Sequence, residues 1–257
     1  MSTSTRAAFF AAGLPGIALA TVLWLTVSEP KRGAQSETFT AEPLGSTLRF
    51  LFSQQSFLIV LIGFWLTTFT NYATAVWIPP FLARVHHLTS AEIGTYAGTF
   101  KGLCGMAGTL VGGLVVAQIS RRDDRWKLWA PAIMSGLAGP VFAVCFLTND
   151  FATMVAALAL GSFLVGFHLG PIFAIAQTVA RTSMRALASA IILLTATCFG
   201  QGVGPLVVGA LNDALKADFG ANAVRYSLLS TSVTTMLGAL LFVWAARSIR
   251  GDIQRAI

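Results

Sequence analysis

The sequence predicts an all-α protein that crosses a membrane several times. Residues 91–119 form a run of 29 residues with only two charges, Glu92 and Lys101. At about 1.5 Å per residue, a helix of this length exceeds the roughly 30 Å of a bilayer's hydrocarbon core. The composition agrees, because 55% of the 257 residues are hydrophobic, 11% are charged and the mean hydropathy is +0.74. Soluble domains rarely have this balance.

Hydropathy predicts about seven transmembrane helices. Thr89 and Glu92 form a capping-box pattern before the third span. Pro79 and Pro80 are expected to end the second span, and Thr-Asn-Asp at 148–150 is expected to form a turn. In chain order the spans are Ala8–Val27, Phe57–Ile78, Ala91–Ile119, Leu128–Leu147, Phe151–Ala180, Ala186–Leu215 and Val224–Ala246.

The first span is expected to be a retained helix and not a cleaved signal peptide. Its apolar run of roughly 20 residues is long for a signal peptide, and no small-x-small cleavage site follows it. Residues 28–56 contain prolines and glycines, then Leu44, Leu48 and Leu51 at helical spacing. This segment is expected to be a cytoplasmic linker that ends in a short helix on the membrane surface.

Basic residues are distributed unevenly between alternate loops. Twelve lie on one side, four lie on the other, and Lys101 lies within a span. Because cytoplasmic loops carry an excess of Lys and Arg, we expect the C-terminus in the cytoplasm and the N-terminus outside, in a bacterial inner (cytoplasmic) membrane. The asymmetry also accounts for the net charge of +7, so membrane lipid is the expected neighbour and no nucleic-acid partner is expected.

The sequence argues against an enzyme and against a metal or cofactor site. An intramembrane hydrolase needs a nucleophile and a base within reach. Ser162 and His168 are six residues apart on one predicted helix, so they point to different faces. His86 and His87 have no companions at metal-ligand spacing. We therefore expect no catalytic activity and no cofactor.

Glycines recur at helical spacing in the third and sixth spans. Gly94, Gly98 and Gly102 lie four residues apart, and further glycines follow in both spans. They are Gly105, Gly108, Gly112 and Gly113 in the third span, and Gly200, Gly204 and Gly209 in the sixth. Small residues at this spacing let helices approach closely in lipid. This pattern predicts two three-helix units, formed by spans two to four and spans five to seven, each with a glycine-rich middle helix. Such internal symmetry is typical of transporters.

Five polar residues are candidates to line a substrate cavity. Lys101 lies about 15 Å into its span, where a charge costs about 2.5–3.5 kcal/mol, so it is expected to face protein or water. One interpretation is that its charge serves an anionic substrate or a coupling step. The other is that its side chain extends to the outer membrane interface or makes a polar contact within the bundle. His168 either relays protons or packs. Asn71, Gln177 and Gln201 either line the cavity or join helices by hydrogen bonds.

The loop after the third span resembles a family motif. Gly113-x-x-x-Ala117-x-x-Ser120-Arg121-Arg122 is similar to the cytoplasmic loop motif of the major facilitator superfamily, Gly-x-x-x-Asp-x-x-Gly-Arg-Arg/Lys. The segments 77–82, 121–126, 169–186 and 204–213 resemble the second half of its spinster-like branch. Residues 14–16 followed by 27–30 resemble the sixth helix and the start of the central loop.

The resemblance implies that the seven spans correspond to helices six to twelve of a twelve-helix carrier. An odd span number with an outside N-terminus likewise indicates a chain that begins part-way through a larger architecture. The motif's aspartate and glycine are replaced by Ala117 and Ser120. In the family this aspartate helps to hold the cytoplasmic face closed, so the resemblance leaves the gate of this chain in doubt. Asp123 or Asp124 is the candidate to take the place of the missing carboxylate.

The implied organisation has four parts. They are a leading helix over 1–27, the linker over 28–56, a six-helix C-terminal bundle over 57–246 and a cytoplasmic tail over 247–257. The implied function is transport of a small or amphiphilic solute by alternating access, as part of a secondary carrier. The alternative is a truncated, non-transporting remnant or interaction subunit. Partners would be the solute, membrane lipid, and either a missing N-terminal half or another copy of the chain.

Overall fold

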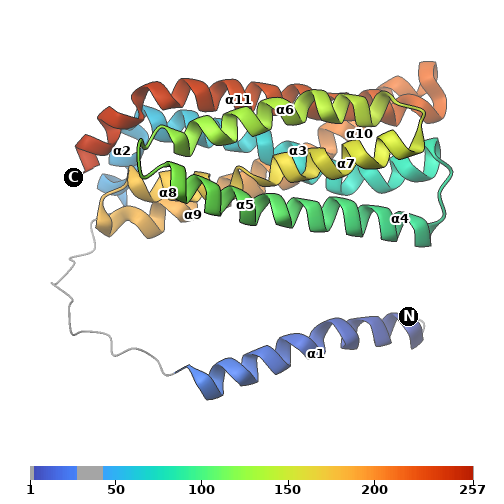
Figure 1. Ribbon diagram of the computed structural model, residues 1–257, viewed down its shortest axis with the longest axis horizontal. Coiled ribbons are helices and arrows are strands. Elements are labelled where there is room, and N and C mark those ends of the chain that lie inside the picture. Colours follow the sequence, from blue (N-terminus) through green and yellow to red (C-terminus); the bar gives the residue numbers. More distant parts are fainter. Residues whose placement is uncertain (1–2, 28–42, 257) are drawn as a thin grey trace. The chain divides into compact units, whose positions relative to one another are not determined.

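The computed structural model describes residues 3–27 and 43–256, which belong to two units, 1–41 and 42–257. The described residues of the first unit form one helix, α1 (Thr3–Thr26), at the position of the predicted first span (Figure 1). Of the predicted linker, residues 28–42 lie outside the described part of the chain.

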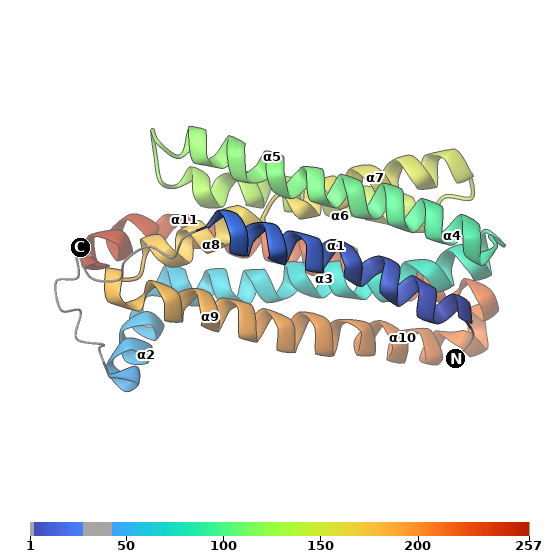
Figure 2. The ribbon, with the colours of Figure 1, turned by 90° about the horizontal axis from the view of Figure 1, so that it is seen from below.

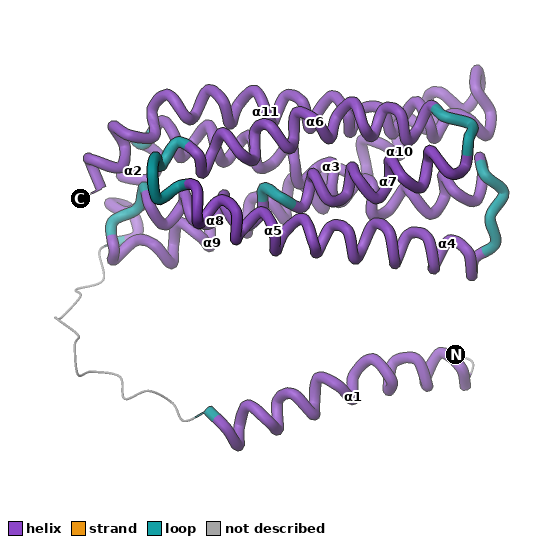
Figure 3. The backbone as a smooth tube through the Cα atoms, in the orientation of Figure 1, coloured by secondary structure: helices purple, strands orange, loops and turns teal. Residues whose placement is uncertain are grey.

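The second unit begins with the short helix α2 (Leu44–Ser53), and its described residues then make six long helical passes. Five apolar helical segments of this part are long enough to cross a membrane, and the last, of 74 residues, contains two passes joined by the turn at Gly220–Asn222. Figure 3 shows these passes as helices joined by short loops. The passes are α3 (Gln55–Val85); α4 (Ser90–Tyr96), η1 (Ala97–Leu103) and α5 (Cys104–Ile119); α6 (Trp126–Leu147); α7 (Phe151–Gly166) and α8 (Leu169–Thr178); α9 (Arg185–Ala196), η3 (Thr197–Val203) and α10 (Gly204–Phe219); and α11 (Ala223–Ala256).

The predicted alternation of loops is confirmed for the second unit. The loops 120–125 and 179–184 lie at one end of the bundle together with the C-terminal turns of α11 (Figure 1). We call this the basic end, because these segments hold most of the twelve Arg and Lys residues that are predicted to share one side of the membrane. The loops 86–89, 148–150 and 220–222 lie at the opposite end. The capping box is also confirmed, since Thr89 N donates to Glu92 Oε2 at 2.9 Å and Glu92 N donates to Thr89 Oγ1 at 3.5 Å.

Helix α11 packs along α3 and α6, and phenylalanines fill the spaces between them. Phe57, Phe64 and Phe242 belong to a buried cluster that also includes residues of α8 and α9. A second cluster nearer the opposite end contains Phe81 and Phe142. Between the two clusters, Thr70 Oγ1 of α3 donates to the Thr231 carbonyl of α11 at 2.9 Å. The polar residues of mid α3 that precede Asn71 are therefore part of helix packing.

Two predicted boundaries were wrong. Helix α3 continues through Pro79 and Pro80 to Val85. Ile78 and Phe81 on either side are both 1% exposed in the core, and in a membrane no water competes for the remaining backbone bonds, so the helix continues. Helix α11 also extends beyond Ala246, because Ile249 and Asp252 are buried against the bundle. The residues predicted as a tail are helical as far as they are described.

The glycine prediction was confirmed for the sixth span and partly wrong for the third. A Cβ atom on Gly200 would lie 2.8 Å from Thr68 Cβ, so η3 and α3 are in close contact. On the third span, Gly108 and Gly112 abut the backbone of α7 at Phe163 and Phe167. Gly94, Gly98 and Gly102, however, have no atom within 4 Å of where a Cβ would be. They lie on a side of this pass that no described helix of the second unit covers.

Candidate functional site

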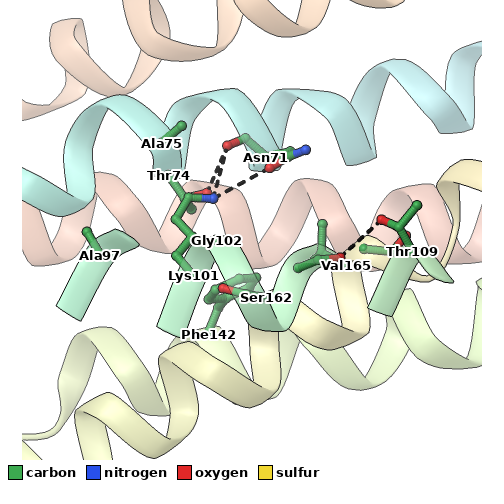
Figure 4. Close-up of a pocket in the computed structure, with 12 residues that line it drawn as sticks. Asn71, Thr74, Ala75, Ala97, Lys101, Gly102, Thr109, Phe142, Ser162 and Val165 are labelled. Atoms are coloured by element: carbon green, nitrogen blue, oxygen red, sulfur yellow. Dashed lines mark hydrogen bonds between the residues drawn. The ribbon is translucent and has the colours of Figure 1, made fainter. Parts of the chain in front are cut away.

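The main candidate site is a cavity of about 380 Å³ between α3, the η1–α5 segment and α7. Figure 4 shows Lys101 and Asn71 pointing toward one another across it. Lys101 is the only charged residue among the described residues that line it. The lining residues are Asn71, Thr74, Ala75, Ala97, Lys101, Gly102, Gly105, Thr109, Phe142, Ser162, Val165 and Gly166.

The lysine is placed by an irregular stretch of helix. Lys101 lies in η1, a seven-residue π-helix between α4 and α5. Its Nζ atom is 3.5 Å from both the backbone carbonyl and the side-chain Oδ1 of Asn71. Both partners are neutral and the bonds are long, so the ammonium group has no counter-ion in the described cavity. An anionic group of a bound molecule would therefore meet a favourable charge.

Hydroxyl groups supply the remaining polarity. Ser162 Oγ on α7 is buried and has no hydrogen-bond partner among the described residues. Thr109 Oγ1 donates to the Gly105 carbonyl at 3.0 Å and to the Gly166 carbonyl at 3.1 Å. Thr109 therefore joins α5 to α7, whereas Ser162 retains a free donor and acceptor for a ligand.

Glycines let the helices that surround the cavity approach one another closely. A Cβ atom added to Gly105 would lie 3.7 Å from the Ser162 carbonyl oxygen, and one added to Gly166 would meet the backbone of Gly105. The backbones of η1, α5 and α7 thus touch where larger side chains would separate them. This approach brings Ser162 to the same cavity as Lys101.

The other three predicted cavity residues lie elsewhere. His168 follows the break between α7 and α8 and is 2% exposed, its Nδ1 against the Val165 carbonyl and its ring edge-on to Phe64. Gln177 on α8 and Gln201 in η3 are exposed and do not line this cavity. Of the five candidates, the structure brings together only Lys101 and Asn71.

The predicted gating loop is divided between two places. Gly113, Ala117 and Ser120 line a separate hollow of about 300 Å³ between α5 and α8. Arg121 and Arg122 are exposed at the basic end.

The carboxylates that follow the loop motif are both paired. Asp123 Oδ2 accepts from Arg250 Nη2 of α11 at 2.8 Å, and Asp124 Oδ1 accepts from Lys127 Nζ at 2.7 Å. The backbone N–H of Arg125, followed by the Arg250 guanidinium, lowers the pKa of Asp123 below its ordinary value. Asp123 therefore links this loop to α11 through an ion pair.

Sequence reasoning missed several residues of the cavity. Thr74 lies one turn after Asn71 on α3, a spacing that could have identified it. Phe142 and Ser162 gave no such signal, because only the packing of α6 and α7 brings them here. No group of three or more potential metal ligands occurs among the described residues.

Comparisons with known proteins agree on the kind of protein this chain resembles. Residues 1–205 match the family model described as Major Facilitator Superfamily. The chain is 30% identical over 253 residues to an MFS-type efflux pump of Mycolicibacterium smegmatis, a match that covers 98% of this chain and 58% of the pump. It is 25% identical over 270 residues to Protein spinster homolog 1 of Bos taurus, covering 94% of this chain and 50% of that protein.

A solved structure has a similar fold. The crystal structure of a bacterial homolog to the human lysosomal transporter Spinster, inward-facing and unoccupied, superposes with a TM-score of 0.80 at 22% identity. The match covers 96% of this chain and 60% of that protein. This chain therefore spans between half and three fifths of the length of these three proteins.

Proposed function

Because this chain belongs to the major facilitator superfamily, we propose that it takes part in moving a small or amphiphilic solute across a membrane by alternating access. Its relatives are membrane transporters and not enzymes. In our proposal the cavity around Lys101 binds the solute, and the chain is an integral protein of a bacterial inner membrane with its basic end in the cytoplasm.

The observation that carries this proposal is the unpaired charge of Lys101. A lysine within a membrane span is costly, and such residues usually mark a substrate or ion pathway. Here its contacts are two neutral oxygens of Asn71 at 3.5 Å, and the free hydroxyl of Ser162 lines the same cavity. An anionic group of the solute would accept hydrogen bonds from both side chains.

The proposal includes a second bundle that faces the cavity. Alternating access requires two bundles that rock around a shared site. The uncovered side of the third pass, with Gly94, Gly98 and Gly102, is where we place this second bundle. It is either an N-terminal half of the carrier or another copy of the chain.

The experiment is a binding measurement with a matched pair of probes. N-octanoylglycine carries a carboxylate, and its amide derivative is the same molecule without the charge. We expect purified protein in neutral detergent to bind the acid in isothermal titration calorimetry, with at least tenfold lower affinity for the neutral amide. Lys101→Leu should remove this preference while abundance and helicity stay unchanged.

The control is Lys216→Leu, which removes an exposed lysine near the opposite end of the bundle and should leave binding unchanged. Equal binding of the acid by wild type and a well-folded Lys101→Leu protein would exclude Lys101 from the site. A wild type that binds neither probe would favour the non-transporting interaction subunit.

A further inference from the structure

Two of the six passes in the described bundle carry a π-helix at the same place. In the second pass η1 occupies Ala97–Leu103 and is followed by the 16-residue helix α5. In the fifth pass η3 occupies Thr197–Val203 and is followed by the 16-residue helix α10. Each π-helix has seven residues, and Lys101 and Gln201 are the fifth residue of their respective segments. They therefore occupy matching positions in the two three-helix units.

Crossing a membrane does not require either π-helix. The π-helix is rare, and it is found mainly as short insertions at functional sites. The residues that follow Lys101 and Gln201 are both glycines, Gly102 and Gly202, and an added Cβ on either would have no atom within 4 Å. Both π-helices thus present an open side to whatever occupies the space beside them.

Both π-helices contact the same helix at nearly the same level. Lys101 Nζ reaches Asn71 of α3, and Gly200 packs against Thr68 of α3. Thr68 and Asn71 are three residues apart, which corresponds to about 4.5 Å along a helix axis. Figure 2 shows α3 between the α4–α5 pass and the α9–α10 pass. Lys101 and Gln201 therefore flank α3, and each belongs to a different one of the two three-helix units.

The position of η3 on this flank is fixed by aromatic stacking. Phe199, two residues before Gln201, stacks on Trp65 of α3 with 4.2 Å between the ring centroids and 18° between the planes. Gln201 itself is exposed, and its amide makes no hydrogen bond to the described residues. A mid-membrane amide without a partner is as unfavourable as any other unsatisfied polar group.

We propose that Gln201 is a second solute contact, paired with Lys101 across α3. This inference rests on the proposed function and deepens it. Because the cavity around Lys101 does not reach Gln201, the solute extends from the cavity over the exposed surface of α3 at Asn71 and Ala75. The amide of Gln201 supplies one donor group and one acceptor. The pair thus selects an anion that carries a hydroxyl or an amide beside its anionic group.

The first test compares two probes that differ in this neighbouring group. N-octanoylglycine has an amide next to its carboxylate, and decanoate has a carboxylate alone. We expect Gln201→Leu to weaken N-octanoylglycine binding about threefold to tenfold, the usual effect of one hydrogen bond, and to leave decanoate binding unchanged. Gln201→Glu should weaken both probes, because it adds a like charge. Cys198→Ser, in the same π-helix, is the control and should bind like wild type.

The second test exchanges the two residues. Lys101→Gln alone should weaken N-octanoylglycine binding at least tenfold. The double exchange Lys101→Gln with Gln201→Lys should restore most of that loss, since the cation then lies on the other flank of the same site. In a cysteine-free background, Gln201→Cys should react with a small polar thiol reagent, whereas Leu240→Cys, on the apolar surface of α11, should not.

The outcomes separate this inference from the proposed function. If Lys101→Gln loses binding while the Gln201 variants bind like wild type and Gln201→Cys does not react, the pairing is wrong and the proposed function stands. If Lys101→Gln also binds like wild type, or if wild type binds neither probe, both proposals fail.

Discussion

Asp252, in the last turns of α11, accepts two hydrogen bonds from Ser56 at the start of α3. Its Oδ2 atom lies 2.7 Å from Ser56 N and 2.6 Å from Ser56 Oγ, between residues 196 positions apart in the chain. Both residues are buried, with Asp252 only 2% exposed. The first N–H groups of a helix have no partner within the helix, and a carboxylate there also meets the positive end of the helix dipole. Asp252 therefore caps α3 from another helix.

Removing this cap should destabilise the bundle. We expect Asp252→Ala to lower the free energy of unfolding by about 1–3 kcal/mol, because it leaves the Ser56 donors buried without a partner. Unfolding in detergent, followed by circular dichroism, measures the change. Gln254→Ala changes an exposed residue of the same turns and should have an effect within about 0.5 kcal/mol. Equal effects of the two variants would show that Asp252 does not cap α3.

The stability of the opposite end should depend on pH through His86. Its ring is edge-on to both Phe81 and Phe151, and its Nε2 atom is buried without a partner among the described residues. Burial lowers the pKa of His86 below its ordinary value of 6.5, and the charges of Arg225 and His87 lower it further. Below about pH 6.5 the unfolded chain therefore binds more protons at this residue than the folded chain, so stability falls as the pH falls.

We expect His86→Gln to remove part of the loss in melting temperature between pH 7.5 and pH 5.5. His87→Asn is the matched control, because His87 is exposed and its φ of 54° is one that asparagine tolerates. The melting curve of His87→Asn should keep the pH dependence of wild type. An unchanged pH dependence in His86→Gln would exclude this residue as its source.

Two glycines of the third pass should respond differently to alanine. A Cβ on Gly112 would lie 2.5 Å from the Phe167 carbonyl oxygen, whereas Gly94 has open space. Gly112→Ala should therefore force α5 away from α7 and cost about 1–3 kcal/mol of stability. Gly94→Ala should be neutral in the isolated chain. Thermal unfolding of both variants in the same detergent measures the difference, and similar melting temperatures would contradict the packing described above.

The orientation in the membrane can be tested by labelling from outside. If the basic end lies in the cytoplasm, single cysteines at Arg121 and Gln254 should be protected from an impermeant thiol reagent in intact cells, and a cysteine at Asp218 should react. All three positions are exposed. Arg121 lies in the loop 120–125 and Gln254 in the last turns of α11, both at the basic end, whereas Asp218 lies in the last turn of α10, next to the turn at the opposite end. Reaction at Arg121 together with protection at Asp218 would reverse the proposed orientation.

The sequence by itself determined the features that depend on neighbouring residues. Hydropathy located all six passes of the second unit, because length and apolarity are local properties. The Thr89–Glu92 capping box and the turn before α7 were predicted from three or four consecutive residues. The distribution of basic residues predicted which loops share an end, since antiparallel passes alternate along the chain.

Tertiary structure alone decided which faces of the helices meet. Identical spacing could not show that Gly112 abuts α7 while Gly94 meets nothing, because this depends on where the two helices cross. Asn71 approaches Lys101 across 30 residues, and Ser56 meets Asp252 across 196. Pro79 predicts a helix end because its missing N–H is a local signal. The packing of Ile78 and Phe81 that keeps α3 intact depends on other helices, so no local signal reveals it. Contacts between distant segments depend on how whole helices are arranged, and no short pattern in the chain encodes that arrangement.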